Sequence, residues 1–396
     1  MNKQQSVSTD ALTASNKQTT LALVLISAVA PAVLTMAPVV AGQLAAELQM
    51  GPAFIGTLFT FELGAMSLAS LPACYWLSRF NWRIAGTIAA VLFILANLGS
   101  VVASSASELI PLRIVSGLGG GSVMILCMGA ASTLPQPDRI YGLWVMGQLA
   151  LGALGLALLP NLFAHFGLSA FFALLAVLML FCLPLLKYLP TRKQPGTDST
   201  ATPLSSGLPL PALIGLLAVL LFCVSLNGVW TFMGAIADSI NIDAQVSGNV
   251  LAVASLLGIA GALSATVLGG RQSYRIPLLA GYAIMIVGIL LLTGSPDEFR
   301  FTIAALGFKY AWTFAFPFIL ASLASIDRNG QLMGMANLVI GGGLALGPLI
   351  AGRMVEQLDG FQAVLLGSAV LAFFSLPLIL LLQTNRAPVY GEPKHV

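Results

Sequence analysis

Apolar positions along the chain form long continuous blocks that short polar stretches separate. Most blocks run for about 20 to 27 residues, the length that a helix needs to cross about 30 Å of hydrocarbon at 1.5 Å per residue. Strands of a membrane barrel would instead show about ten residues of alternating polarity. We therefore predict twelve membrane-spanning helices, numbered in chain order as spans 1 to 12, over residues 20–46, 53–77, 83–104, 108–133, 140–164, 168–189, 210–236, 244–268, 276–294, 300–325, 330–354 and 361–383.

The polar stretches divide these spans into two groups of six. Residues 188–209, YLPTRKQPGTDSTATPLSSGLP, are rich in Pro, Ser and Thr and lie at the middle of the chain, as expected of a linker. The predicted organisation is a disordered cytoplasmic tail, a six-helix bundle, a cytoplasmic linker, a second six-helix bundle and a cytoplasmic tail, over residues 1–18, 19–189, 190–208, 209–384 and 385–396.

Composition supports a membrane protein and argues against an enzyme. Apolar residues make up 58% of the chain and charged residues 8%, whereas soluble domains carry about 25% charged residues. The sequence has no Ser/His/Asp set, paired histidine ligands, phosphate loop or dinucleotide fingerprint, and only 2 histidines. We expect no catalytic residue, metal site or cofactor, and no nucleic-acid partner.

The distribution of basic residues predicts the orientation. If the N-terminus is cytoplasmic, thirteen of the 17 Lys and Arg residues lie on the cytoplasmic side, and acidic residues gather at the outer ends of the spans. Basic residues near span ends face the cytoplasm in membrane proteins. The sequence therefore predicts a multi-pass protein of the inner (cytoplasmic) membrane, with both termini in the cytoplasm.

Equivalent residues recur at a constant offset of 192 on either side of the linker. The matched pairs are Gly56 with Gly248, Arg79 with Arg271, Arg83 with Arg275, Gly142 with Gly334, and Gly155 with Gly347. The two R-x-x-x-R pairs both fall between the second and third spans of their half. Such a repeat predicts two six-helix bundles related by a pseudo-twofold axis along the membrane normal, a transporter architecture with its site near the midplane.

Several motifs resemble those of the major facilitator superfamily of secondary transporters, across nearly the whole chain. SRFNWR (78–83) is similar to the loop motif after span 2, and RIVSGLGGG (113–121) to the R-x-x-x-G-x-G pattern of span 4. The resemblance implies two halves that rock around a central cavity lined by spans 1, 4, 7 and 10. It also implies a conformational role for Arg79, Arg83, Arg271 and Arg275, and we expect helix packing at Gly117, Gly119, Gly155, Gly347 and Pro348.

Three ionisable residues lie inside the spans, and two of them form the first candidate site. Glu62 in span 2 is roughly 13 Å from the outer end, and Arg113 in span 4 is about 8 Å from it. A lone charge there costs about 2.5 to 3.5 kcal/mol, so each group needs a partner, a cavity or a change of protonation state. We hypothesise that Glu62 is the proton-coupling site and that Arg113 modulates it. The alternative is a structural ion pair that takes no part in transport.

The third ionisable residue is Lys309 in span 10, at a depth similar to that of Glu62. On a helix it shares a face with Thr313 and Phe316, and Trp312 flanks that face. A cation beside aromatic rings in a dry cavity suits a small organic anion. The alternatives are that Lys309 extends toward the outer surface, or that it neutralises Glu62 across the two halves. Weaker substrate-binding candidates are Asn227 in span 7 and Gln148 in span 5.

These observations predict a proton-coupled transporter that moves a small organic solute, with an organic anion as the first choice, by alternating access. The alternative functions are proton-antiport efflux of drugs or metabolites, and a transport-inactive membrane receptor on the same fold. The expected partners are the solute, protons and the lipid bilayer, and the expected state is a monomer.

Overall fold

The computed structural model describes residues 2–103, 105–191, 209–269, 274–327 and 331–384, and the elements within them are helices. The first half contains α1 (Asn2–Val29), α2 (Ala32–Thr35), α3 (Ala37–Leu48), α4 (Pro52–Leu68), α5 (Ser70–Arg79), α6 (Trp82–Val102), α7 (Ala106–Ala131), α8 (Pro137–Phe166), α9 (Ser169–Cys182) and the 3-10 helix η1 (Leu183–Tyr188). The second half contains α10 (Leu210–Ser239), α11 (Ala244–Leu268), α12 (Arg275–Leu291), α13 (Glu298–Ala324), α14 (Gln331–Gln357) and α15 (Gln362–Thr384).

The helices follow the predicted spans, which confirms an all-α membrane fold. Among the described residues, 10 helices are long and apolar enough to cross a membrane. The two spans outside that set are span 9, whose helix α12 has 17 residues, and span 1, which is divided into α1, α2 and α3. Span 1 is divided because Pro31 and Pro38 each remove a backbone N–H from the helix.

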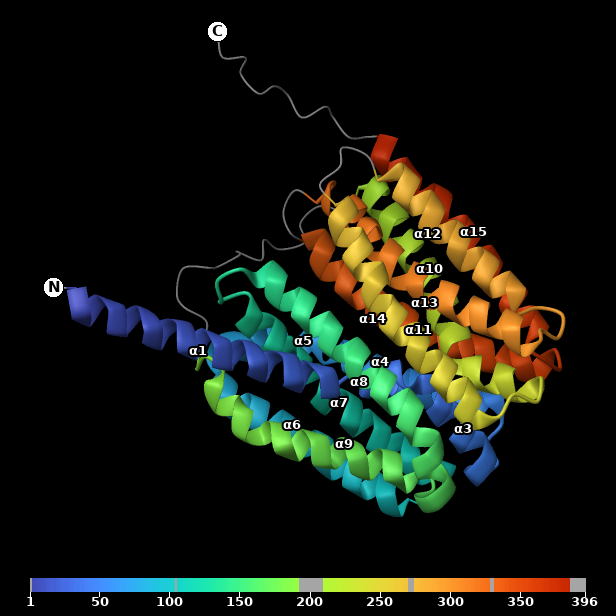
Figure 1. Cartoon of the computed structure of the whole chain (residues 1–396), viewed down its shortest axis with the longest axis horizontal. Helices are drawn as coiled ribbons and strands as arrows, with labels where there is room; N and C mark the ends of the chain where they lie inside the picture. The colour runs from blue at the N-terminus through green and yellow to red at the C-terminus, as the bar shows by residue number, and fades with distance from the viewer. Residues whose placement is uncertain (1, 104, 192–208, 270–273, 328–330, 385–396) are drawn as a thin grey trace, which may run out of the picture.

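The ends of the chain depart in part from the prediction. Helix α1 begins at Asn2, so residues 2–18 are helical where the sequence predicts a disordered tail. No Gly or Pro occurs before Pro31, and the membrane part of α1 supplies a nucleus from which the helix extends at little cost. In Figure 1 this part of α1 projects away from the bundles. Most of the predicted linker, residues 192–208, and the tail 385–396 lie outside the described residues.

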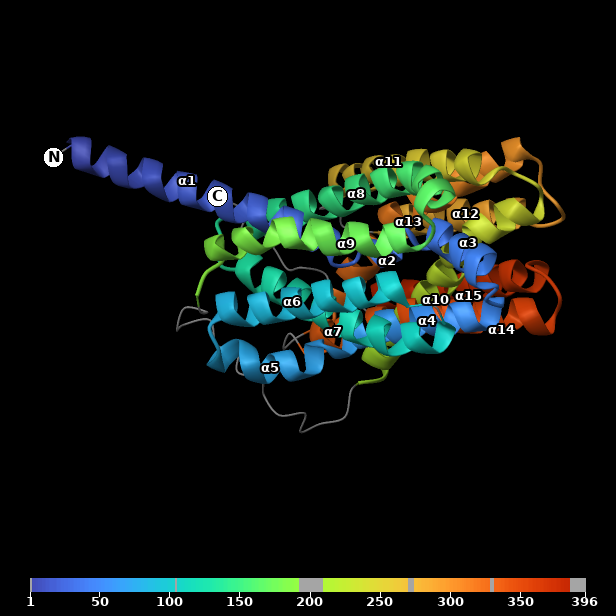
Figure 2. The ribbon, with the colours of Figure 1, turned by 90° about the horizontal axis from the view of Figure 1, so that it is seen from below.

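Three pairs of helices make most of the contacts between the described parts of the two halves. Helix α4 packs against α14, α8 against α11, and α3 against α10. Figure 2 shows the first two pairs on opposite sides of the molecule. Helices α4 and α11 are the second spans of their halves, and α8 and α14 are the fifth spans. Each pair therefore joins the second span of one half to the fifth span of the other, and exchanging the halves converts one pair into the other. This is the arrangement that a pseudo-twofold axis requires.

Single residues repeat the same symmetry. A Cβ at Gly56 would overlap the carbonyl oxygen of Pro348, and a Cβ at Gly248 would lie 2.5 Å from that of Leu156. Gly248 is Gly56 shifted by 192 positions (56 + 192), and Leu156 is Pro348 shifted back by the same number (348 − 192). The offset found in the sequence therefore relates the two helix contacts that join the halves.

Most of these contacts lie toward one end of the molecule, which we call the closed end. Hydrogen bonds and glycine contacts between the described parts of the two halves involve residues 34–67 and 156–160 on one side, and 230–248 and 341–356 on the other. The closed end carries the turns that follow α3, α8, α10 and α14. Figure 1 shows the halves diverging toward the opposite end, where α15 finishes; we call this the linker end.

Candidate functional site

Glu62 and Arg113 form a buried ion pair inside the first half. Arg113 Nη1 donates to Glu62 Oε1 over 3.2 Å, and the side chains are 2% and 3% exposed for Arg113 and Glu62. The carboxylate comes from α4 and the guanidinium from α7. These helices approach closely because Gly117 has no side chain, and a Cβ there would overlap the carbonyl oxygen of Glu62.

Neighbouring polar groups hold both members of the pair. Arg113 donates to Asn97 Oδ1 at 3.2 Å and to Ser100 Oγ at 2.6 Å. Ser116 donates to Glu62 Oε1 at 3.1 Å. These three residues were not among the sequence candidates, although all are polar residues within predicted spans. A buried ion pair needs such extra hydrogen bonds to offset the loss of water around the charges.

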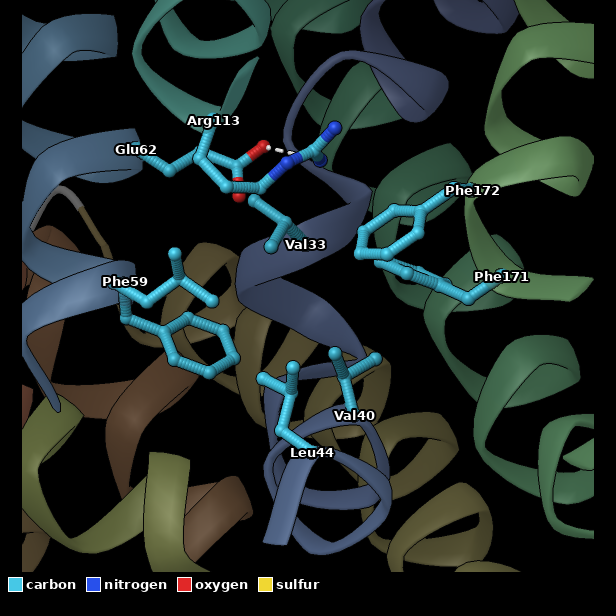
Figure 3. Close-up of a pocket in the computed structure, with 9 residues that line it drawn as sticks. Val33, Val40, Leu44, Phe59, Glu62, Arg113, Phe171 and Phe172 are labelled. Carbon is cyan, nitrogen blue, oxygen red and sulfur yellow. Dashed lines mark hydrogen bonds and ion pairs between the residues drawn. The ribbon is translucent and has the colours of Figure 1, made fainter. Parts of the chain in front are cut away.

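A small pocket lies beside the ion pair. Its other lining residues are apolar: Val33, Val40, Leu44, Leu58, Phe59, Phe171 and Phe172. Figure 3 shows the ion pair at one end of the pocket and Val40 and Leu44 at the other. Phe172 also lies under the guanidinium, with 4.4 Å between Arg113 Cζ and the ring centroid. The pocket belongs to the first half, and its walls come from α2, α3, α4, α7 and α9.

Lys309 lies in the second half, between two tryptophan rings. Its Nζ is 3.8 Å from the ring centroid of Trp230 and 3.9 Å from that of Trp312. The two rings are nearly perpendicular, with centroids 6.0 Å apart and an interplanar angle of 76°. Lys309 is 1% exposed, so the ammonium is held by aromatic faces away from solvent.

Lys309 has no counter-charge in the part of the chain that the structure describes. The buried carboxylate of Glu62, the sequence candidate for that role, is paired with Arg113 in the other half. In this structure, therefore, Lys309 neither neutralises Glu62 nor extends to the outer surface, and these two alternative interpretations of the sequence do not hold. The first half contains a compensated pair of buried charges, and the second half contains an uncompensated cation.

The rest of the predicted Lys309 face serves helix packing. Thr313 bonds within its own helix, to the carbonyl oxygens of Lys309 and Tyr310, both at 3.2 Å. Phe316 stacks on Phe222 of α10, with centroids 6.2 Å apart. The lysine ammonium instead contacts Trp312, which was predicted to flank this face.

Gln148 and Asn227 satisfy carbonyl groups that prolines leave without a partner. In a helix the carbonyl four residues before a proline lacks its usual N–H donor. Gln148 Nε2 donates to Ser27 O at 3.1 Å, four residues before Pro31. Asn227 Nδ2 donates to Leu344 O, four residues before Pro348. Both side chains bridge helices here, which limits their availability to a solute.

Trp230 does the same at a third proline. Its Nε1 donates to Leu34 O at 3.0 Å, four residues before Pro38. The sequence shows where all three free carbonyls lie, because each is four residues before a proline. It does not show which side chain from another helix donates to each carbonyl.

The glycines predicted to serve helix packing lie against residues of neighbouring helices. Gly119 lies against Ala89 O, Gly155 against Met36, and Gly347 against Gly228. The contacts of Gly155 and Gly347 are again related by the offset, since 36 + 192 is 228.

Among the predicted loop arginines, Arg79 lies over the Tyr75 ring at 4.3 Å, and Arg83 Nε donates to Leu189 O at 2.7 Å. Arg275 is the first residue of α12, and Arg271 lies outside the described residues.

The family comparison gives one match that covers nearly the whole chain. The model described as Major Facilitator Superfamily matches residues 23–216 and 215–395. None of the curated proteins matches the sequence significantly.

Solved structures of transporters share the fold at low sequence identity. A D-xylose-proton symporter aligns with a TM-score of 0.74 and 15% identity, covering 91% of this chain and 96% of its own. A bacterial homologue of the human lysosomal transporter Spinster, in an inward-facing and unoccupied conformation, aligns with a TM-score of 0.72 and 15% identity over 93% and 97%. The nucleoside transporter NupG aligns with a TM-score of 0.70 and 14% identity over 94% and 100%.

Proposed function

This chain belongs to the major facilitator superfamily, and on that basis we propose that it carries a small organic anion together with a proton across the inner membrane. As a multi-pass transporter of this family it is not an enzyme. The proposed solute site is centred on Lys309 in the second half, and the proposed proton site is Glu62 in the first half. Solute and proton would cross as the two bundles alternate between two states. In one state the site is open at the linker end, and in the other it is open at the opposite end, which is closed in this structure.

The observation that carries the proposal is the uncompensated charge of Lys309. Burying a cation without a partner is costly, and an anionic solute removes that cost by pairing with the ammonium. Trp230 and Trp312 supply apolar faces beside the charge, which favour a solute with an aromatic or apolar body. A neutral sugar or an organic cation would leave the lysine charge unpaired.

The orientation is part of the proposal. Basic residues lie near the linker end, among them Arg79, Arg83, Arg139, Lys187 and Arg275, and acidic residues lie near the closed end, among them Glu47, Asp243, Asp297, Glu356 and Asp359. The excess of basic residues favours a cytoplasmic linker end. The structure then corresponds to a state in which the outer side is closed.

Lys309→Met tests the solute site. We expect the affinity for an organic acid found in a thermal-shift screen of the purified protein to fall by roughly 10- to 100-fold, because a hydrogen bond to a charged group contributes about 1.5–3 kcal/mol. Lys187→Met is the matched control, because Lys187 also lies over an aromatic ring, that of Tyr188, but is exposed. Equal affinity in the Lys309 variant and the wild type would exclude the anion site.

Glu62→Gln tests the proton site. In vesicles with an imposed pH gradient, we expect this variant to exchange the solute but to lose the accumulation that the gradient drives. Glu356→Gln, an exposed carboxylate at the closed end, is the control and keeps gradient-driven uptake. If Glu62→Gln still accumulates solute with the wild-type pH dependence, Glu62 and Arg113 are a structural ion pair.

A further inference from the structure

Trp230 contacts both the buried cation and the opposite half of the protein. We propose that Trp230 is the residue that couples the Lys309 site to the closed end, so that loss of the lysine–indole contact weakens the hold of the second half on span 1. This inference rests on the proposed function, in which Lys309 receives the anion, and it assigns a positioning role to a residue that need not touch the solute.

The first contact is between the indole face and the ammonium. Lys309 Nζ lies 3.8 Å from the Trp230 centroid, and both side chains are almost completely buried, at 1% and 0% exposure. Gly258 of α11 lies beside the lysine stem, and a Cβ there would make an ordinary contact of 3.4 Å with Lys309 Cγ. In the proposal, the position of the Trp230 ring depends on the lysine ammonium that lies between it and Trp312.

The second contact is between the indole edge and the first half. Trp230 Nε1 donates over 3.0 Å to Leu34 O, in the short helix α2. Pro38 deprives this carbonyl of its partner within the helix, so the indole is the donor that satisfies it in the described structure. Separation of the halves at this point would break this part-buried hydrogen bond and leave the Leu34 carbonyl without its donor, which opposes the separation.

The other two proline-linked donors do not connect the halves. Gln148 and Ser27 both belong to the first half, and Asn227 and Leu344 both belong to the second. Trp312 also holds the ammonium, but its indole makes no hydrogen bond within the described residues. Among these residues, Trp230 both contacts the lysine ammonium and donates a hydrogen bond to the opposite half.

A consequence follows for the arrival of an anion. An ion pair with the ammonium is stronger than its contact with an aromatic face, so an anion draws Lys309 away from the rings. The Trp230 ring then loses one of its two anchors. The closed end is held less firmly when the site is occupied than when Lys309 lies in its cage.

Two conservative substitutions separate the edge contact from the face contact. Trp230→Phe and Trp312→Phe both keep an aromatic face toward Lys309, but only the first removes the hydrogen bond to Leu34 O. We would attach spin labels at Ala46 and Ser239, exposed positions at the closed end of α3 and α10, and measure their distance distribution in ligand-free protein. Trp230→Phe should raise the population with a separated closed end by roughly two- to tenfold, as expected for one net hydrogen bond, and Trp312→Phe should match the wild type.

A second pair of variants leaves both tryptophans in place. Pro38→Ala restores an N–H that competes for Leu34 O, and Pro31→Ala restores one that competes for Ser27 O, inside the first half. Pro38→Ala should change the distances in the same direction as Trp230→Phe, and Pro31→Ala should not. This pair keeps the test decisive if Trp230→Phe fails to fold.

A double-mutant cycle tests the link to the cation. Lys309→Met alone should separate the closed end, and it should add no further separation in Trp230→Phe. Additive effects, or wild-type distances in Trp230→Phe and Pro38→Ala, would overturn the inference. Because no solute or gradient is used, failure here is distinct from failure of the proposed function, which is decided by the affinity of Lys309→Met for an organic acid.

Discussion

Gly56→Ala is expected to open the closed end of the protein. The added methyl would overlap the carbonyl oxygen of Pro348, which belongs to the backbone of α14 and has no flexible side chain to move aside. Overpacking of this kind typically costs about 1–3 kcal/mol, which corresponds to a roughly 5- to 150-fold shift in the equilibrium between closed and open forms. Distances between spin labels at Gln49 and Leu358, both exposed near this contact, would measure the shift.

Gly64→Ala is the matched control on the same helix interface. A Cβ at Gly64 would be 3.8 Å from the Ala345 side chain, an ordinary contact, so we expect distances close to those of the wild type. Gly248→Ala, at the symmetry-related contact with Leu156 O, should act in the same direction as Gly56→Ala. Unchanged distances in both Gly56→Ala and Gly248→Ala would contradict the view that these glycines set the approach of the halves.

Arg113→Met is expected to destabilise the folded protein strongly. It leaves the Glu62 carboxylate buried, with Ser116 as its remaining hydrogen-bond donor. Breaking a buried ion pair by removing one partner costs about 3–5 kcal/mol. The loss would be measured as a lower melting temperature, or a lower denaturant midpoint, of the detergent-purified protein.

Adding Glu62→Gln to Arg113→Met should recover part of that stability. The double variant has no buried charge at this position, and replacing both members of a buried pair is often close to neutral. Asn97→Ala, which removes one acceptor of Arg113 and leaves the ion pair, should cost less, about 1.5–3 kcal/mol. A double variant less stable than Arg113→Met would show that the main destabilising effect is not the unpaired charge.

Much of the fold followed from the sequence because it depends on features that are local or periodic. Block length fixes the spans, and the offset of 192 fixes the relation of the halves. The offset alone identifies Gly56 and Gly248 as equivalent positions. The residues that these glycines contact, Pro348 and Leu156, are also separated by the offset of 192. No sequence match suggested this second pair, because the contact atom is a backbone oxygen that any residue supplies.

The division of span 1 into three helices could not be predicted from the sequence, although the sequence shows Pro31 and Pro38. Prolines are common in membrane helices, and their effect depends on whether other helices satisfy the carbonyls that they release. At Ser27 and Leu34 the donors are Gln148 and Trp230, which are more than 100 residues away in the chain. Polar residues in spans were therefore easily interpreted as solute contacts.

Depth along a span could not decide which charges pair. Glu62 and Lys309 have similar predicted depths, and a salt bridge between them was consistent with the sequence. The structure pairs Glu62 with Arg113 because Gly117 brings α4 and α7 together, whereas Trp230 and Trp312 enclose Lys309 in the other half. The rotation of each helix about its own axis decides which charges pair. The weak amphipathicity of these spans does not reveal that rotation.

The uncompensated ammonium between two indoles has an electrical consequence. As an ion pair, Glu62 and Arg113 contribute no net charge to the membrane interior, whereas Lys309 contributes one. A unit charge displaced through a full 100 mV exchanges about 2.3 kcal/mol with the field. In the proposed cycle we therefore expect reorientation of the empty carrier to be electrogenic and voltage-dependent. A monovalent anion at Lys309 would cancel that charge, and a proton on Glu62 would restore it by leaving the charge of Arg113 unpaired.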